Sequence, residues 1–191
     1  MKAFFITLAC SLTTILNFAQ TSEHLTFKGV PIDGTLNQFV TKMTQNGFTN
    51  SGTENGKAIL NGDFAGYKHC VINVSTLKQK DLVNKIGVLF TKKDTWSTLS
   101  ENYFELKQLL IEKYGEPSDI IEKFDSYQPK DENLKWIYVL ANNCKYISTW
   151  QTDKGKIQLS IENNQGSSFV KLTYSDKINS DIIKANAKDD L

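Results

Sequence analysis

The sequence predicts an α+β fold in which two tandem repeats, each a helix plus an antiparallel meander, form one sheet with both helices on one face. Amphipathic segments at 36–46 and 98–114 each end on a glycine, and short alternating segments separated by turn residues follow each of them. Alternating strands belong to a sheet with one packed face, and the two helices supply its cover. Each repeat alone is too small to bury its own apolar face, so we expect one shared core.

The first helix is expected to begin after Thr35, because Thr35 followed by Gln38 has the spacing of a capping box. Gly47 takes the left-handed conformation that commonly closes a helix. One face of the segment is apolar at helical spacing, through Leu36, Phe39, Val40 and Met43.

The second helix repeats this pattern at greater length. Thr98 and Glu101 form another possible capping box, although Asp94 offers a start one turn earlier. Gly115 ends the helix, and Pro117 forbids its continuation. Its apolar face is formed by Trp96, Leu99, Tyr103, Leu106 and Leu110.

Strands are expected after each helix, and TDKG at 152–155 is the clearest hairpin signal between two of them. The first repeat covers about 25–91 and the second about 94–175, and a C-terminal helix at about 177–190 completes the domain. A leading strand is expected at 24–30. The other expected strands are 57–64, 68–76, 82–90, 118–124, 134–140, 144–150, 156–162 and 168–174.

The first 19 residues are expected to be a signal peptide, because an apolar stretch of secretory length follows Lys2 and Ala19 supplies a small residue for cleavage. Threonines interrupt the stretch, and it is shorter than the ~20 apolar residues that span a membrane, so no transmembrane anchor is expected. Lipidation of Cys10 fits badly, because the hydrophobic run continues after it. The remaining chain, 20–191, is expected to be one periplasmic or secreted domain.

Charge composition argues against nucleic acids and anionic membranes as partners. The chain has 22 basic and 21 acidic residues, and every basic residue is a lysine. Removal of the signal peptide also removes Lys2, which leaves 21 lysines against 21 acids. A neutral chain without arginine lacks both the electrostatic footprint and the bidentate donors that phosphate recognition uses.

Two cysteines, Cys70 and Cys144, remain after cleavage, and an even pair in an oxidising compartment suggests a disulfide. The alternative is two free thiols buried as small hydrophobic residues. Cys70 fits this alternative, because it shares an apolar strand face with Ile72 and Val74.

No catalytic centre is recognisable, and neither a metal nor a cofactor is expected. The sequence has no nucleophile elbow, phosphate loop or dinucleotide fingerprint. Of the two histidines, His24 follows the cleavage site, and His69 precedes Cys70 on a strand, where neighbours point to opposite faces. The acids near expected turns are assigned to local hydrogen bonding there, namely Asp63, Asp125 and Asp153.

Aromatic residues are the one candidate for a binding site. Trp136 and Tyr138 share one face of an expected strand, and Tyr146 and Trp150 share one face of the next. Under the helices these four side chains are core. On the open face they would form an exposed platform for a sugar ring or a protein partner.

Four segments, taken with the export signal, resemble a group of secreted proteins of Bacteroides-type gut bacteria: FKGVPIDGTLNQFVTKMTQNGF, GDFAGYK, VSTLKQKDLVNKIGVLF and DKINSDIIKANAKDDL. That group has no assigned activity, so the resemblance implies an exported α+β domain and no chemistry. The order of elements is also similar to that of β-lactamase-inhibitor proteins and small outer-membrane assembly lipoproteins, without a motif specific to either.

The sequence favours an exported, non-enzymatic module that binds a protein or glycan through a sheet face or edge. The alternative is a small secreted hydrolase that cleaves glycans or peptides through carboxylates the sequence does not identify. A module predicts an exposed patch on a shallow surface, whereas a hydrolase predicts a concave pocket with at least two acids of shifted pKa.

Overall fold

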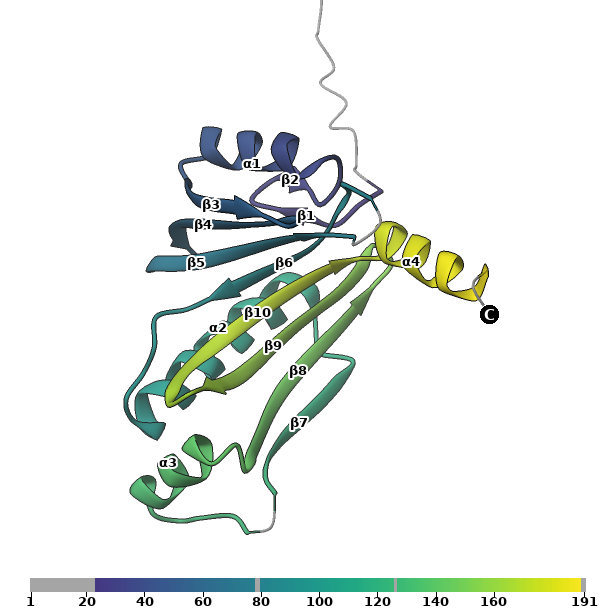
Figure 1. Cartoon of the computed structure of the whole chain (residues 1–191). Coiled ribbons are helices and arrows are strands. Elements are labelled where there is room, and N and C mark those ends of the chain that lie inside the picture. The colour runs from purple at the N-terminus through teal and green to yellow at the C-terminus, as the bar shows by residue number, and fades with distance from the viewer. Residues whose placement is uncertain (1–22, 78–79, 126, 190–191) are drawn as a thin grey trace, which may run out of the picture.

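The computed structural model describes residues 23–77, 80–125 and 127–189. Within them, eight strands form one antiparallel sheet in the order β3-β4-β5-β6-β10-β9-β8-β7, and β1 and β2 form a separate hairpin (Figure 1). The predicted α+β class is confirmed. The strands are β1 (Thr26–Phe27), β2 (Val30–Pro31), β3 (Thr49–Glu54), β4 (Lys57–Phe64), β5 (Tyr67–Thr76), β6 (Val83–Leu89), β7 (Asp119–Phe124), β8 (Cys144–Thr152), β9 (Gly155–Asn164) and β10 (Ser167–Asp176). The helices are α1 (Leu36–Gln45), α2 (Trp96–Tyr114), α3 (Glu132–Leu140) and α4 (Lys177–Asp189).

The two halves of the sheet have the same order of elements. Helix α1 precedes the meander β3-β4-β5-β6, and α2 precedes β7-β8-β9-β10, with α3 inserted between β7 and β8. The two meanders join through their last strands, β6 and β10, which pair antiparallel. As a result, the first strand of each half, β3 or β7, lies at an edge. This order agrees with the expected repeats; that they arose by duplication stays a prediction.

One face of the sheet carries the shared core. In an antiparallel sheet, directly paired residues point to the same face. The helix α1 contacts β3, β4 and β5, and α2 contacts β9 and β10, so a single core spans both halves (Figure 1). The register aligns one buried row of side chains across six strands, formed by Leu60, Ile72, Val88, Leu172, Leu159 and Ser148.

Helix α1 begins as its sequence predicts. The Thr35 hydroxyl accepts a hydrogen bond from the Gln38 N–H at 3.3 Å, and the Gln38 side chain accepts one from the Thr35 N–H at 3.1 Å. This reciprocal pair satisfies two backbone donors that the first turn of a helix leaves free. The apolar face that follows is buried against the sheet, through Leu36, Phe39, Val40 and Met43.

Helix α2 begins at Trp96 with Thr95 as its cap, next to the earlier of the two expected starts, Asp94, and before the other, Thr98. The Thr95 hydroxyl accepts from the Thr98 N–H at 3.3 Å, so Thr98 lies in the first turn. Trp96, expected on the apolar face of this helix, is its first residue, and its ring packs 5.0 Å from that of Tyr146 on β8. Helix α2 ends at Gly115, whose carbonyl accepts a hydrogen bond from Trp150 Nε1 at 2.8 Å.

Three other elements differ from the prediction. The segment 134–140, expected as a strand, belongs to α3, which begins where the Asp131 carboxylate accepts from the Leu134 N–H at 3.0 Å. Strand β3 was not predicted, because all of its residues are polar or glycine and all are exposed. The leading segment forms the short hairpin β1–β2 instead of one strand.

The Asp176 carboxylate ties the leading segment to the start of α4. It is fully buried and accepts hydrogen bonds from the backbone N–H groups of Leu25 and Asn179, each at 2.9 Å. One of its oxygens also lies 3.0 Å from His24 Nδ1. The Asn179 amide then donates to Val83 O at 2.9 Å, which links α4 to β6. His24, which follows the expected cleavage site, is thus half-buried against the C-terminal end of β10.

Two buried asparagines are expected to respond to substitution in opposite directions. Asn102 on α2 is 3% exposed, and its amide approaches the Tyr67 hydroxyl without reaching hydrogen-bonding geometry. Asn179 is 2% exposed and donates to Ile32 O and Val83 O. Because an unsatisfied buried amide is unfavourable, we expect Asn102→Leu to raise the free energy of unfolding by about 1 kcal/mol.

Asn179→Leu serves as the matched substitution. It should lower the free energy of unfolding by about 2–3 kcal/mol, because it leaves buried carbonyl groups without their donor. Urea denaturation of both variants measures the difference. Destabilisation of similar size in both would show that Asn102 also makes a hydrogen bond that matters to the fold.

Candidate interaction surface

The face of the sheet opposite α1 and α2, which we call the open face, carries side chains that the register arranges in rows. Residues that alternate with the buried row point to it. Helix α4 follows β10 and runs away from the end of the sheet (Figure 1). The open face is therefore a broad, shallow surface formed by strands of both halves, and three of its rows differ clearly in chemistry.

The first row contains three lysines, and one acid, Glu54 on the β3 edge, pairs with Lys57 at its end. Lys57 pairs with Ser75, Ser75 with Lys85, Lys85 with Ser175, and Ser175 with Lys156. All three lysines are exposed. Because their strands β4, β6 and β9 alternate with strands that contribute serine, the ammonium groups are spaced along the row. We call Lys57, Lys85 and Lys156 the lysine row.

The second row is uncharged over five strands and offers hydrogen-bonding groups. It runs from Asn73 through Gly87, Thr173 and Gln158 to Thr149, and Asp119 at the β7 edge is its first charge. The short amide and hydroxyl side chains lie half-buried between their neighbours on the sheet. Such a row suits contact with polar groups of another molecule, because its donors and acceptors face outward.

The third row is mostly aliphatic, through Val71, Leu89, Ile147 and Ile121. Lys171 and Ser160 interrupt it in the middle, between Leu89 and Ile147. Lys171 Nζ lies 3.9 Å from Glu162, so its charge is partly compensated within the open face. In the lysine row, Lys57 pairs with Glu54, whereas Lys85 and Lys156 have only serine and glutamine directly opposite them. The positive potential of this row is therefore concentrated around Lys85 and Lys156.

The four aromatic residues considered as a platform do not come together on the open face. Tyr146 and Trp150 lie on the core side of β8, where they are 6% and 2% exposed. Trp136 and Tyr138 lie on α3, half-buried, and the Tyr138 ring packs 5.9 Å from Phe124. Their predicted strand is a helix, so the alternation that placed them on one face does not apply. In the structure these residues belong to the core or pack against it.

The disulfide considered between Cys70 and Cys144 does not form, and both thiols are free. The first cysteine lies on β5 and the second on β8, four strand spacings away, or about 19 Å across the sheet. A disulfide requires Cα atoms within about 7 Å of each other. Burial raises the pKa of both thiols, that of Cys144 to about 11, so neither is a reactive thiolate at neutral pH.

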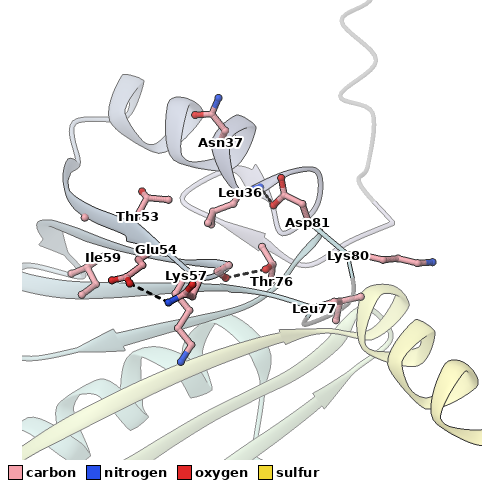
Figure 2. Close-up of a pocket in the computed structure, with 13 residues that line it drawn as sticks. Leu36, Asn37, Thr53, Glu54, Lys57, Ile59, Thr76, Leu77, Lys80 and Asp81 are labelled. Atoms are coloured by element: carbon pink, nitrogen blue, oxygen red, sulfur yellow. Dashed lines mark hydrogen bonds between the residues drawn. The ribbon is translucent and has the colours of Figure 1, made fainter. Parts of the chain in front are cut away.

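A hollow of about 1120 Å³ lies between α1, the β3–β4 hairpin and the chain that enters β6 (Figure 2). Its two acids stand on separate walls, Glu54 on the hairpin and Asp81 beside α1. The Asp81 carboxylate accepts the Leu36 N–H at 2.9 Å, so it serves the first turn of α1. Neither histidine nor cysteine lines this hollow.

The aspartates and histidines also have local structural partners. Asp63 accepts hydrogen bonds from Lys68 Nζ at 2.5 Å and from the His69 N–H at 3.2 Å, and the bond to Lys68 lowers the Asp63 pKa. These contacts hold the β4–β5 turn, as expected for an aspartate in that position. Within the described ranges, no group of three or more His, Cys, Asp or Glu side chains is arranged to hold a metal ion.

Sequence reasoning missed the lysine row, because its members come from three strands that are far apart in the chain. Lys57, Lys85 and Lys156 meet only through the register of β4, β5, β6, β10 and β9. The one signal available was their position within alternating segments, next to apolar residues that face the core. None of the helices in the described residues is long and apolar enough to cross a membrane. Comparison of the chain with protein-family models, with curated proteins and with solved structures found no match.

Proposed function

We propose that this protein is an exported, non-enzymatic binding module whose open face binds an acidic surface of another protein. The observation that carries the proposal is the lysine row, three exposed lysines aligned on a sheet face that the two main helices leave uncovered. The resemblance to secreted proteins of Bacteroides-type bacteria and the apolar N-terminal stretch support export.

The rows of the open face supply different parts of such an interaction. Aligned ammonium groups steer an acidic partner and set its orientation. The neighbouring row of amides and hydroxyls, from Asn73 to Thr149, provides hydrogen bonds at the centre of the sheet. The aliphatic residues beyond it supply apolar area that a partner removes from water. An exposed flat surface with these three components fits protein recognition better than a small concave ligand site.

The proposal is tested by reversing charge on the open face. The double variant Lys85→Glu/Lys156→Glu should lose at least about tenfold in affinity for partners captured from envelope extract, because attraction to an acidic surface becomes repulsion. Binding by the unmodified protein should also weaken as ionic strength rises, because salt screens exposed charges. Quantitative pull-down followed by binding titration with each captured protein measures both effects.

The matched control is Lys42→Glu/Lys113→Glu. These exposed lysines lie on α1 and α2, which cover the other face, and the change in net charge is the same. The control should retain the partners of the unmodified protein. If the open-face variant captures the same partners with the same affinity as the unmodified protein, the lysine row is not the binding surface and the proposal is wrong.

A further inference from the structure

Strand β7 forms a free edge of the sheet. It pairs with β8 along its whole length, and the described residues place no strand on its other side (Figure 1). The strand is regular, without a bulge, and Ile120 in its middle is 47% exposed. The opposite edge, β3, has a register shift between Asn50 and Gly52, which interrupts its ladder. Of the two edges, β7 is the one with a continuous row of backbone groups for another strand.

The hydrogen-bonding phase of β7 identifies which backbone groups are free. The Asp125 N–H donates to Asn143 O at 3.0 Å, which continues the ladder between β7 and β8. Hydrogen-bonded pairs alternate in an antiparallel ladder, so Asp119, Ile121 and Lys123 direct their backbone groups towards β8. The N–H and C=O groups of the alternate residues, Ile120 and Glu122, therefore point away from the sheet.

We propose that two copies of this chain associate by pairing their β7 strands antiparallel about a two-fold axis at Ile121. In this register, Ile120 of each copy forms a hydrogen-bonded pair with Glu122 of the other, and the two Ile121 side chains meet on the open face. Asp119 of each copy then lies directly opposite Lys123 of the other. Both residues are exposed and both point to the open face. The pairing therefore creates two opposite-charge contacts, one on each side of the axis.

Charge favours this register over those shifted towards the C-terminal end of β7, and it is the register that sets Asp119 opposite Lys123. A shift that centres the axis on Glu122 places the two Glu122 side chains against each other, and a further shift places Lys123 against Lys123. Like charges directly opposite each other destabilise strand pairing. Glu122 is also already engaged, because Lys107 Nζ contacts its carboxylate at 2.6 Å and directs it towards α2. It can thus face Ile120 of the second copy without losing its own partner.

The proposed pairing keeps the faces of the two sheets in register. A two-fold axis perpendicular to the sheet leaves both open faces on one side, so the lysine rows of both copies belong to one continuous surface. A contact of one short strand pair buries less than the ~1,000 Å² of a stable interface, so we expect a weak dimer. This self-association is independent of the proposed partner of the open face and can fail while that proposal stands.

Charge reversal on β7 tests the pairing. Sedimentation velocity from about 5 to about 500 μM, the range suited to a small interface, should show reversible dimerisation of the unmodified protein. Asp119→Lys and Lys123→Asp should each weaken it at least about tenfold, because each single change places like charges together at both contacts. The double variant Asp119→Lys/Lys123→Asp should restore it, because the contacts are again of opposite charge.

A monomer throughout that range, or single variants that dimerise like the unmodified protein, would overturn the proposal. Failure of the double variant to recover would overturn the register. Thr53→Lys, on the exposed β3 edge, should dimerise as the unmodified protein does. Loss of dimerisation in that variant would place the contact at β3 and contradict the assignment to β7.

Cysteine crosslinking provides a second, independent measurement. In a Cys144→Ser background, Ile121→Cys should form a disulfide-linked dimer under mild oxidation, because Ile121 meets its own copy in a non-hydrogen-bonded pair with Cα atoms about 4.5 Å apart. Ile120→Cys in the same background should not crosslink, since Ile120 lies opposite Glu122. Equal crosslinking at both positions would show random collision, and none at position 121 would contradict the pairing.

Discussion

Replacement of Gly155 by alanine should be among the most destabilising single changes in the chain, with a loss of about 4 kcal/mol or failure to fold. Gly155 follows the tight turn between β8 and β9 and has a φ of +152°. A Cβ there would lie 2.2 Å from Ser175 O and 2.7 Å from Leu25 Cδ1. The first of these atoms belongs to the backbone of β10, so relief requires the strands themselves to separate. Urea denaturation monitored by circular dichroism measures the loss.

Gly66→Ala provides the matched control for Gly155→Ala. Gly66 also has a positive φ, +83°, but a Cβ there would have open space around it. Only the conformational cost then remains, so we expect a loss of about 1 kcal/mol. If Gly155→Ala lowers the free energy of unfolding no more than Gly66→Ala does, the β8–β9 turn does not lie as close to the end of β10 as the structure indicates.

Trp150→Ala should cost about 4 kcal/mol, because it opens a large cavity under α2. Trp150 is 2% exposed, and its Nε1 donates to the Gly115 carbonyl at the end of that helix. Trp150→Phe should cost less than Trp150→Ala, since it keeps much of the apolar contact and loses mainly the hydrogen bond. Thermal and urea unfolding of both variants measure these losses.

Trp136→Ala is the comparison, because Trp136 is only half-buried on α3. We expect a loss of about 1.5 kcal/mol, in proportion to its smaller burial. Sequence reasoning treats Trp136 and Trp150 alike, and equal losses would favour that view. A large difference would instead support the structure, in which one lies in the shared core and the other lies beside it.

The helices α1 and α2 could be predicted because local signals define them. In α1, the capping pair Thr35 and Gln38 and the spacing of apolar residues agree, and no tertiary contact is needed to read them. In α2, the local signals predicted the helix and its apolar face but left two starts open, Asp94 and Thr98. The helix is capped by Thr95, and Trp96 in its first turn packs against Tyr146 in the core.

Helix α3 could not be predicted because its composition favours a strand. The segment LKWIYVL is rich in aromatic and β-branched residues, which are typical of strands. Its helical state depends on the Asp131 cap and on the burial of Val139. Neither of these is evident from the strand-like composition of the segment. Strand β3 could not be predicted for the opposite reason. It has no apolar alternation, and only pairing with β4 makes it a strand.

The candidate surface could be predicted only in outline. A sheet with one solvated face follows from alternation such as that of Ile157, Gln158 and Leu159. Which polar residues meet on that face depends on strand order and register, which no local pattern contains. The meeting of Lys57, Lys85 and Lys156 follows from the junction of β6 with β10, a pairing between residues about 85 positions apart.

The central claim is that α1 and α2 cover one face of the sheet and leave the other face accessible. Thiol labelling tests it most directly, with Gln158→Cys on the open face in a Cys144→Ser background and the native Cys70 as the buried reference. Under native conditions, we expect position 158 to react at the rate of an exposed thiol, while Cys70 reacts only when the protein unfolds. If position 158 is protected as strongly as Cys70, the open face is covered and the claim is wrong.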